Sequence, residues 1–76
     1  MTTVRVNIAN RDRRVGAVVR ALAVEVAGYQ AVKGTTKEFL RNHGYYEFEF
    51  PRDYQAHDFR ETVSKYIRSD LATVVE

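Results

Sequence analysis

The chain has 76 residues, of which 45% are hydrophobic and 12% aromatic, a composition that excludes a disordered protein and predicts a single compact domain, residues 1–76. It contains no cysteine, which excludes disulfide frameworks, thiolate zinc sites, iron–sulfur clusters and thiol catalysis. The formal net charge is +2, but it is unevenly distributed: residues 1–41 carry eight basic and three acidic side chains, whereas residues 42–76 carry four basic and seven acidic ones. Folding either creates a basic and an acidic face from these halves or intermixes them as ordinary surface charge.

A half-buried strand is predicted at residues 2–8, TTVRVNI, because apolar and polar side chains alternate there without interruption. β-Branched residues suit the buried positions of such a strand. The face expected to be buried holds Val4, Val6 and Ile8. The opposite face holds Thr3, Arg5 and Asn7.

An amphipathic helix is predicted next, with Asn10 or Asp12 as its N-cap and Gly28 at its end. Its apolar stripe recurs at helical spacing and comprises Val15, Val18, Val19, Leu22 and Val26. The opposite face comprises Arg13, Ala17, Arg20, Ala21 and Val24. That face is less polar than expected for one that meets only solvent.

Residues 29–44, YQAVKGTTKEFLRNHG, allow two interpretations. In the first, a strand over residues 29–33 precedes a short helix near 36–43, delimited by Thr35, Glu38 and Gly44. In the second, which we favour slightly, a long strand ends near Leu40 and residues 41–44 turn into the next strand as a hairpin.

Residues 45–50, YYEFEF, alternate again and predict a strand that ends at Pro51, because proline lacks an N–H group. Its buried face is expected to be the aromatic one, with Tyr46, Phe48 and Phe50. A second long helix should begin at Asp53 and bury Ala56, Phe59, Val63, Tyr66 and Ile67. Residues 70–75 predict a short last strand.

The predicted order is β-α-β-β-α-β, or β-α-β-α-β-α-β if the short helix near 36–43 forms. The first order is that of a ferredoxin-like sandwich, an α+β fold with two helices on one face of a mainly antiparallel sheet. Many functions share this order, so it does not indicate one of them.

The residue pattern gives little support for catalysis or for a cofactor. Neither serine, Ser64 or Ser69, lies in a nucleophile elbow, and phosphate-binding glycine loops are absent. Asp53, His57 and Glu61 follow one drifting helix face and could hold a metal only with a further ligand such as His43. A string of polar residues on a helix surface explains them better. We therefore expect no catalytic, cofactor or metal site.

The sheet is also a poor platform for nucleic acid. RNA-binding modules stack bases on aromatic residues of a sheet, but here the aromatic face of residues 45–50 is needed for the core. The solvent face shows Tyr45 with Glu47 and Glu49, and these two carboxylates would repel phosphates.

The first helix is the better candidate for a partner surface. Its cationic side chains could follow phosphates, but alanines and a valine stand where base-reading polar side chains would be expected. Arginine among small apolar residues is more typical of a protein interface. A merely solvated face is the remaining explanation. The predicted partner-binding residues are Arg11, Arg13, Arg14, Arg20 and Val24.

We therefore predict a small non-enzymatic binding protein, a protein-binding regulator, adaptor or inhibitor, with nucleic-acid binding through the arginine-rich first helix as the alternative. The arginine, alanine and valine content suggests a GC-rich bacterium or its phage. The N-terminus lacks the apolar region of a signal peptide and no segment could span a membrane, so we expect a cytoplasmic protein with no membrane partner. A homodimer would suit so small a core.

Overall fold

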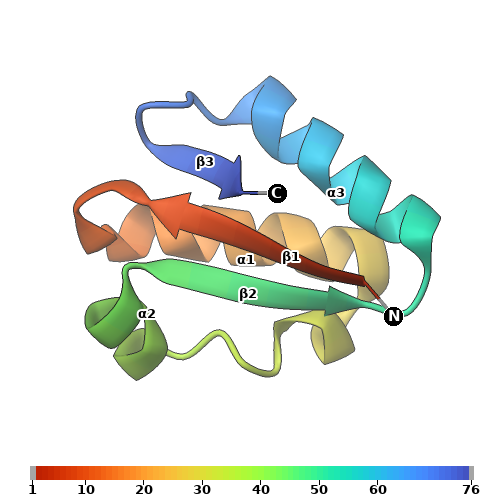
Figure 1. Ribbon diagram of the computed structural model, residues 1–76, viewed down its shortest axis with the longest axis horizontal. Helices are drawn as coiled ribbons and strands as arrows, with labels where there is room; N and C mark the ends of the chain where they lie inside the picture. Colours follow the sequence, from red (N-terminus) through yellow and green to blue (C-terminus); the bar gives the residue numbers. More distant parts are fainter. Residues whose placement is uncertain (1, 76) are drawn as a thin grey trace.

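The computed structural model describes residues 2–75 and shows a small α+β domain (Figure 1). Within those residues, three α-helices and two 3₁₀ helices accompany a three-stranded antiparallel sheet. In chain order the elements are β1 Thr2–Ile8, η1 Ala9–Arg11, α1 Arg13–Ala27, η2 Tyr29–Val32, α2 Lys37–His43, β2 Tyr45–Phe50, α3 Asp53–Tyr66 and β3 Ala72–Val75. None of the helices in this part of the chain has both the length and the apolar character needed to cross a lipid bilayer.

The sheet has the strand order β2–β1–β3, and β1 runs antiparallel to both neighbours. Val4 lies opposite Phe48, and Val6 lies opposite Tyr46 on one side and Val74 on the other. Figure 1 shows α1 crossing behind this sheet, and α3 packs against both α1 and the strands. One face of the sheet therefore meets the helices, while the other carries exposed polar side chains such as those of Thr3, Arg5 and Asn7.

The predicted alternation of the two long strands is confirmed. Val6, Phe48 and Phe50 are completely buried, and the polar partners of the same strands point away from the core. The ring of Phe59 from α3 lies 4.9 Å from that of Phe48 and 5.0 Å from that of Phe50, measured between centroids. Strands and helix thus share one aromatic core.

Helix α1 has the predicted ends but is rotated relative to the predicted apolar stripe. The Asp12 carboxylate accepts the N–H of Arg14 at 2.8 Å, and Gly28 ends the helix with a φ of 81°. The buried positions are Gly16, Val19 and Ala23, whereas Val18 is 52% exposed. The expected burial of Val18 is therefore wrong.

A close approach of α1 to the sheet explains this rotation. A Cβ atom at position 16 would lie 2.9 Å from Cε2 of Tyr46 and 3.2 Å from Cδ2 of Leu40. Only a glycine lets the helix backbone come this near to the buried tyrosine ring. The helix face that holds Gly16, Val19 and Ala23 consequently turns towards the sheet, and Val18 turns outwards.

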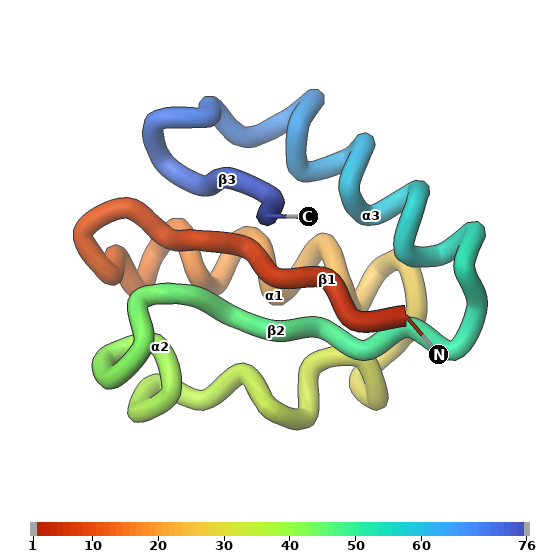
Figure 2. Tube along the Cα trace, viewed as in Figure 1, coloured from red at the N-terminus to blue at the C-terminus, as the bar shows by residue number. Residues whose placement is uncertain are grey.

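The hairpin interpretation of residues 29–44 is wrong, because the structure forms η2 and then α2 there. Ala31 and Val32 are both buried although they are adjacent, which a strand with alternating side chains cannot achieve. The trace in Figure 2 shows this segment running beside β2 on the side away from β1, and η2 contacts β2. It covers the edge where the fourth strand of the predicted sandwich would pair.

The predicted short helix near 36–43 is confirmed as α2, but a different threonine caps it. Thr36 accepts the N–H of Phe39 at 3.0 Å, and Gly44 ends the helix with a φ of 79°. Thr35 is buried instead and donates its hydroxyl to the carbonyl of Val32 at 2.7 Å.

Helix α3 buries Ala56, Phe59 and Val63 as predicted, and Ile67 just beyond its end is 9% exposed. Tyr66 is 69% exposed, so its predicted burial is wrong. The N-cap is Arg52 rather than Asp53, which occupies the first turn, where a negative charge favours the helix dipole. The last strand, Ala72–Val75, is shorter than predicted.

Candidate functional site: a basic groove between α1 and α2

Two adjoining hollows lie between the start of α1 and the start of α2. The larger has a volume of about 770 Å³ and the smaller about 480 Å³. They share Arg13 and Lys37, so we treat them as one feature, the basic groove. Its cationic residues are Arg11, Arg13, Arg14, Arg20, Lys37 and Arg41, and its acidic residues are Asp12 and Glu38.

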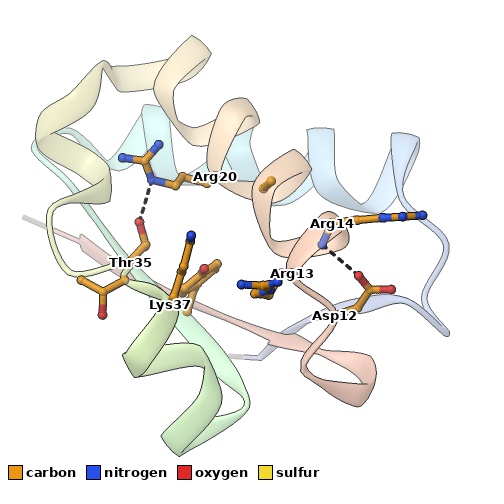
Figure 3. Close-up of a pocket in the computed structure, with 9 residues that line it drawn as sticks. Asp12, Arg13, Arg14, Arg20, Thr35 and Lys37 are labelled. Carbon is orange, nitrogen blue, oxygen red and sulfur yellow. Dashed lines mark hydrogen bonds between the residues drawn. The ribbon is translucent and has the colours of Figure 1, made fainter.

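The larger hollow takes its cations from two helices. Arg13, Ala17 and Arg20 line it from α1, and their spacing of four and three residues places them on one helix face. Lys37 comes from the first turn of α2. Figure 3 shows the Lys37 side chain pointing from α2 towards α1, between Arg20 and Arg13. Three positive charges from two helices therefore surround one space.

Arg20 is held in place by a buried threonine. Its Nε donates to Oγ1 of Thr35 at 3.2 Å, as Figure 3 shows, and Thr35 is only 7% exposed. The Thr35 hydroxyl in turn donates to the Val32 carbonyl, so the acceptor is itself fixed. These two hydrogen bonds in series orient the guanidinium group of Arg20 at the wall of the groove, with its terminal nitrogens beyond the fixed Nε.

Tyr46 contributes an aromatic, hydroxyl-bearing residue to the lining of the larger hollow. Burial raises the pKa of this hydroxyl, and the positive charge of Arg20 opposes that effect more weakly. The hydroxyl is therefore protonated near neutral pH and can donate a hydrogen bond to an anion.

The one carboxylate in the larger hollow is engaged by the backbone. Oδ1 of Asp12 accepts the N–H groups of Arg14 and Val15 at 2.8 and 3.5 Å, as the N-cap of α1. Its negative charge partly offsets the neighbouring cations, but it is held at the margin of the groove rather than paired with Arg13, Arg20 or Lys37 within the described residues. The space is electropositive as a result.

The structure separates the five predicted partner-binding residues. It brings Arg13 and Arg20 to one hollow and places Arg11 in the adjoining one. Arg14 lies at the margin, and Figure 3 shows its side chain extending away from Arg13. Val24 is partly buried against the core and lies outside both hollows, because the rotation of α1 turns it inwards.

Sequence reasoning missed Lys37 and Arg41, which complete the groove from α2. The signal was present in the first interpretation of residues 29–44, since Thr36 can cap a helix in which positions 37 and 41 share a face. The hairpin interpretation instead places Lys37 in a strand and Arg41 in a turn, so the two residues share no face there.

The other residues considered for chemistry do not converge. His57 lies 3.2 Å from Glu61 on the exposed surface of α3, while Asp53 accepts a hydrogen bond from Thr2. His43 packs with its ring centroid 4.4 Å from that of Phe39. Among residues 2–75, no group of three or more metal-ligating side chains lies close enough to hold an ion.

The open face of the sheet is occupied by its own residues. The guanidinium carbon of Arg5 lies 4.3 Å from the ring centroid of Tyr45, and an Arg5 nitrogen lies 3.5 Å from Glu47. The aromatic residue on the exposed face of β2 is thus covered by a cation that also contacts Glu47.

Comparisons with protein-family models, curated proteins and solved structures find no match to this chain.

Proposed function

We propose that this chain is a small non-enzymatic binding protein, a regulator, adaptor or inhibitor, whose basic groove holds an acidic segment of a partner protein. The observation that carries the proposal is the convergence of Arg13, Arg20 and Lys37 on one hollow. Such a cluster of cations attracts carboxylates and speeds encounter with an acidic partner.

The surroundings of these cations favour a protein over a nucleic acid. The arginines alternate with Ala17 and the ring of Tyr46, so a ligand meets apolar surface as well as charge. Arginine and tyrosine are enriched at the centres of protein interfaces. The carboxylates of Glu47 and Glu49 on the sheet leave phosphates no second favourable surface there.

Nucleic-acid binding is the second candidate, and one observation supports it. The two adjoining hollows carry six cations in continuity, which would suit successive phosphates. Readout of base edges would need polar side chains that this face does not offer in quantity. The proposal therefore predicts at most a sequence-independent, strongly salt-dependent affinity for DNA or RNA.

The arrangement of the sheet fits a modified ferredoxin-like sandwich. In this proposal, β1, β2 and β3 are three of its four strands, and residues 28–44 replace the fourth. The replacement supplies Lys37 and Arg41, so the departure from the standard fold is also what builds the groove. A cysteine-free binding domain of this kind fits a cytoplasmic role.

Charge reversal in the groove tests the proposed function. The double variant Arg13→Glu/Arg20→Glu should lose at least about 100-fold in affinity for the partner, because two attractive contacts become repulsive. The control variant Lys33→Glu/Arg52→Glu changes the net charge equally at exposed positions outside the groove and should bind normally.

The measurement is affinity purification from the native host with each of the three proteins as bait, followed by mass spectrometry of protein and sequencing of nucleic acid. A protein retained by wild type and control but lost by the groove variant supports the proposal. Nucleic acid with that same pattern supports the second candidate. Equal retention by all three baits contradicts both.

A further inference from the structure

The opposite flank of α1 carries another hollow of different character, which we call the apolar groove. Its volume is about 310 Å³, and it lies between α1, the end of α3 and the turn before β3. Its residues are Val15, Val18, Tyr66, Ile67 and Leu71, with Arg14 and Arg68 beside them. Val18, Tyr66 and Leu71 are 52%, 69% and 39% exposed.

Two of these exposed side chains have helical spacings that predict burial. Val18 belongs to the apolar stripe of α1 and Tyr66 to that of α3, but the rotation of α1 and the end of α3 turn both outwards. Apolar residues that a fold leaves exposed together, rather than singly, make this hollow a candidate site of interaction.

The apolar groove is preformed by the backbone. The N–H of Leu71 bonds to the carbonyl of Arg68 at 2.9 Å, and the Leu71 carbonyl accepts the N–H of Ala9 at 2.8 Å. Arg68 is tied to Asp70 by two contacts of 3.0 and 2.7 Å. The turn that presents Leu71 is therefore fixed on both sides, and a ligand need not order it.

Charge on the rim indicates which ligand suits this surface. The Asp70 carboxylate balances Arg68, but the lining includes no carboxylate that would balance Arg14. Arg14 also lines the basic groove, so it joins the two surfaces. The ridge of α1 between them carries the small, exposed side chains of Ala17 and Ala21, over which a partner can lie closely.

We propose that the partner is a protein with an acidic amphipathic helix, which places apolar side chains in the apolar groove and carboxylates against Arg14 and the basic groove. This inference rests on the proposed function and specifies the chemistry of the partner. A helix suits both surfaces, because residues three or four positions apart lie on one face. One face can therefore present apolar side chains to the apolar groove while adjacent positions present carboxylates to the arginines.

Two other occupants fit less well. A two-fold interface between copies of this chain, centred on the apolar groove, would bring the Arg14 side chains of the two copies together. A nucleic acid could place phosphates beside Arg14 and stack one base on Tyr66. It would gain little from Val18 and Leu71, which offer neither hydrogen bonds nor a stacking surface.

Selection from a random peptide display library on the immobilised wild-type protein provides the first test. Enriched sequences should be net acidic, with apolar residues three and four positions apart. Their affinity, measured by fluorescence polarisation, should fall at least about tenfold in Tyr66→Glu, because an anchor is lost and a carboxylate repels the peptide. Tyr54→Glu is the matched control, an exposed tyrosine of α3 outside the apolar groove, and should stay within about twofold of wild type.

The outcomes separate this inference from the proposed function. Peptides lost with Arg13→Glu/Arg20→Glu but unaffected by Tyr66→Glu would overturn the apolar contact and keep the basic groove. Enrichment of no acidic sequence would overturn the inference. If sedimentation equilibrium shows a wild-type dimer that Tyr66→Glu abolishes, the apolar groove is an interface with a second copy and the inference is overturned. If an oligonucleotide binds more tightly than any peptide, the surface binds nucleic acid and the inference is likewise overturned.

Discussion

The basic groove and the apolar groove lie on opposite flanks of α1, and they differ in how far the sequence reveals the residues that form them. The basic groove is built from residues whose charge is visible in the sequence, and folding only brings α2 against α1. The apolar groove is built from residues such as Val18 and Tyr66, whose spacing suggests a core position. A single event, the close approach of α1 at Gly16, decides both, because it sets the rotation of the helix.

Replacement of Gly16 should have the largest effect, since it disturbs both flanks. In Gly16→Leu the new side chain meets the buried Tyr46 ring, and overpacking should cost about 3 kcal/mol or more, most of the stability of so small a domain. Ala21→Leu, on the exposed ridge of the same helix, is the control and should change stability by less than about 0.5 kcal/mol. Urea unfolding monitored by circular dichroism compares them, and similar midpoints would contradict the assigned rotation.

Adjacent valines provide the next contrast. Val19 is fully buried and Val18 is half exposed, so Val19→Ala should lose about 2 kcal/mol while Val18→Ala loses less than about 0.5 kcal/mol. The partner's affinity should respond in the reverse order, provided that both variants are folded. Thermal unfolding and a binding titration of each variant check the two rankings. Equal destabilisation would return Val18 to the core and remove the apolar groove.

Salt should weaken the contact of the partner with the basic groove but not its contact with the apolar groove, a difference of about one order of magnitude in affinity. Raising the salt concentration from about 50 to about 500 mM screens the basic groove and should weaken partner binding about tenfold. In Arg13→Glu/Arg20→Glu the remaining apolar contact should show a much shallower dependence, whereas Tyr66→Glu should keep a steep one. Titrations at several salt concentrations give the slopes, and identical slopes in all three proteins would show that the flanks do not act separately.

Asp12 allows a finer test of the basic groove. Asn is as good an N-cap as Asp, so Asp12→Asn should preserve the stability of α1 while removing the negative charge in the larger hollow. Affinity for an acidic partner should rise about threefold, by less than 1 kcal/mol. Asp12→Ala, which also removes the cap, should lose about 1 kcal/mol of stability. Weaker binding by the folded Asp12→Asn protein would argue against an acidic ligand.

The smallest effect concerns Tyr46. Because burial raises its pKa above the ordinary value of 10.0, the unfolded chain ionises first, and stability should be constant below that pH and fall as the pH rises through it. Arg20→Gln removes the opposing positive charge and should raise the pKa of Tyr46 further. Ultraviolet titration of the phenolate at 295 nm, with Tyr46→Phe to identify its contribution, measures both. A pKa of Tyr46 at or below the ordinary value of 10.0 would contradict its burial beside the groove.

The success of sequence reasoning followed the range of the interactions involved. Strand alternation in β1 and β2, the stop at Gly28 and the cap at Asp12, one of two candidates, depend on neighbouring residues, and the structure confirms them. Arg13 and Arg20 were placed on one face for the same reason. For residues 29–44 the favoured hairpin is wrong, and only the short helix of the alternative interpretation is confirmed. A capping threonine and a hairpin-like turn are both local signals, and packing against β2 chooses between them.

The sequence alone therefore determined the inward faces of the strands, the ends of most elements and the concentration of arginine near α1. Tertiary structure decided how far α1 is rotated, which side chains remain outside the core and which cation from α2 meets Arg13 and Arg20. The physical reason is steric. The space that Gly16 leaves for Tyr46 joins residues 30 positions apart, and no local pattern around either residue encodes that contact.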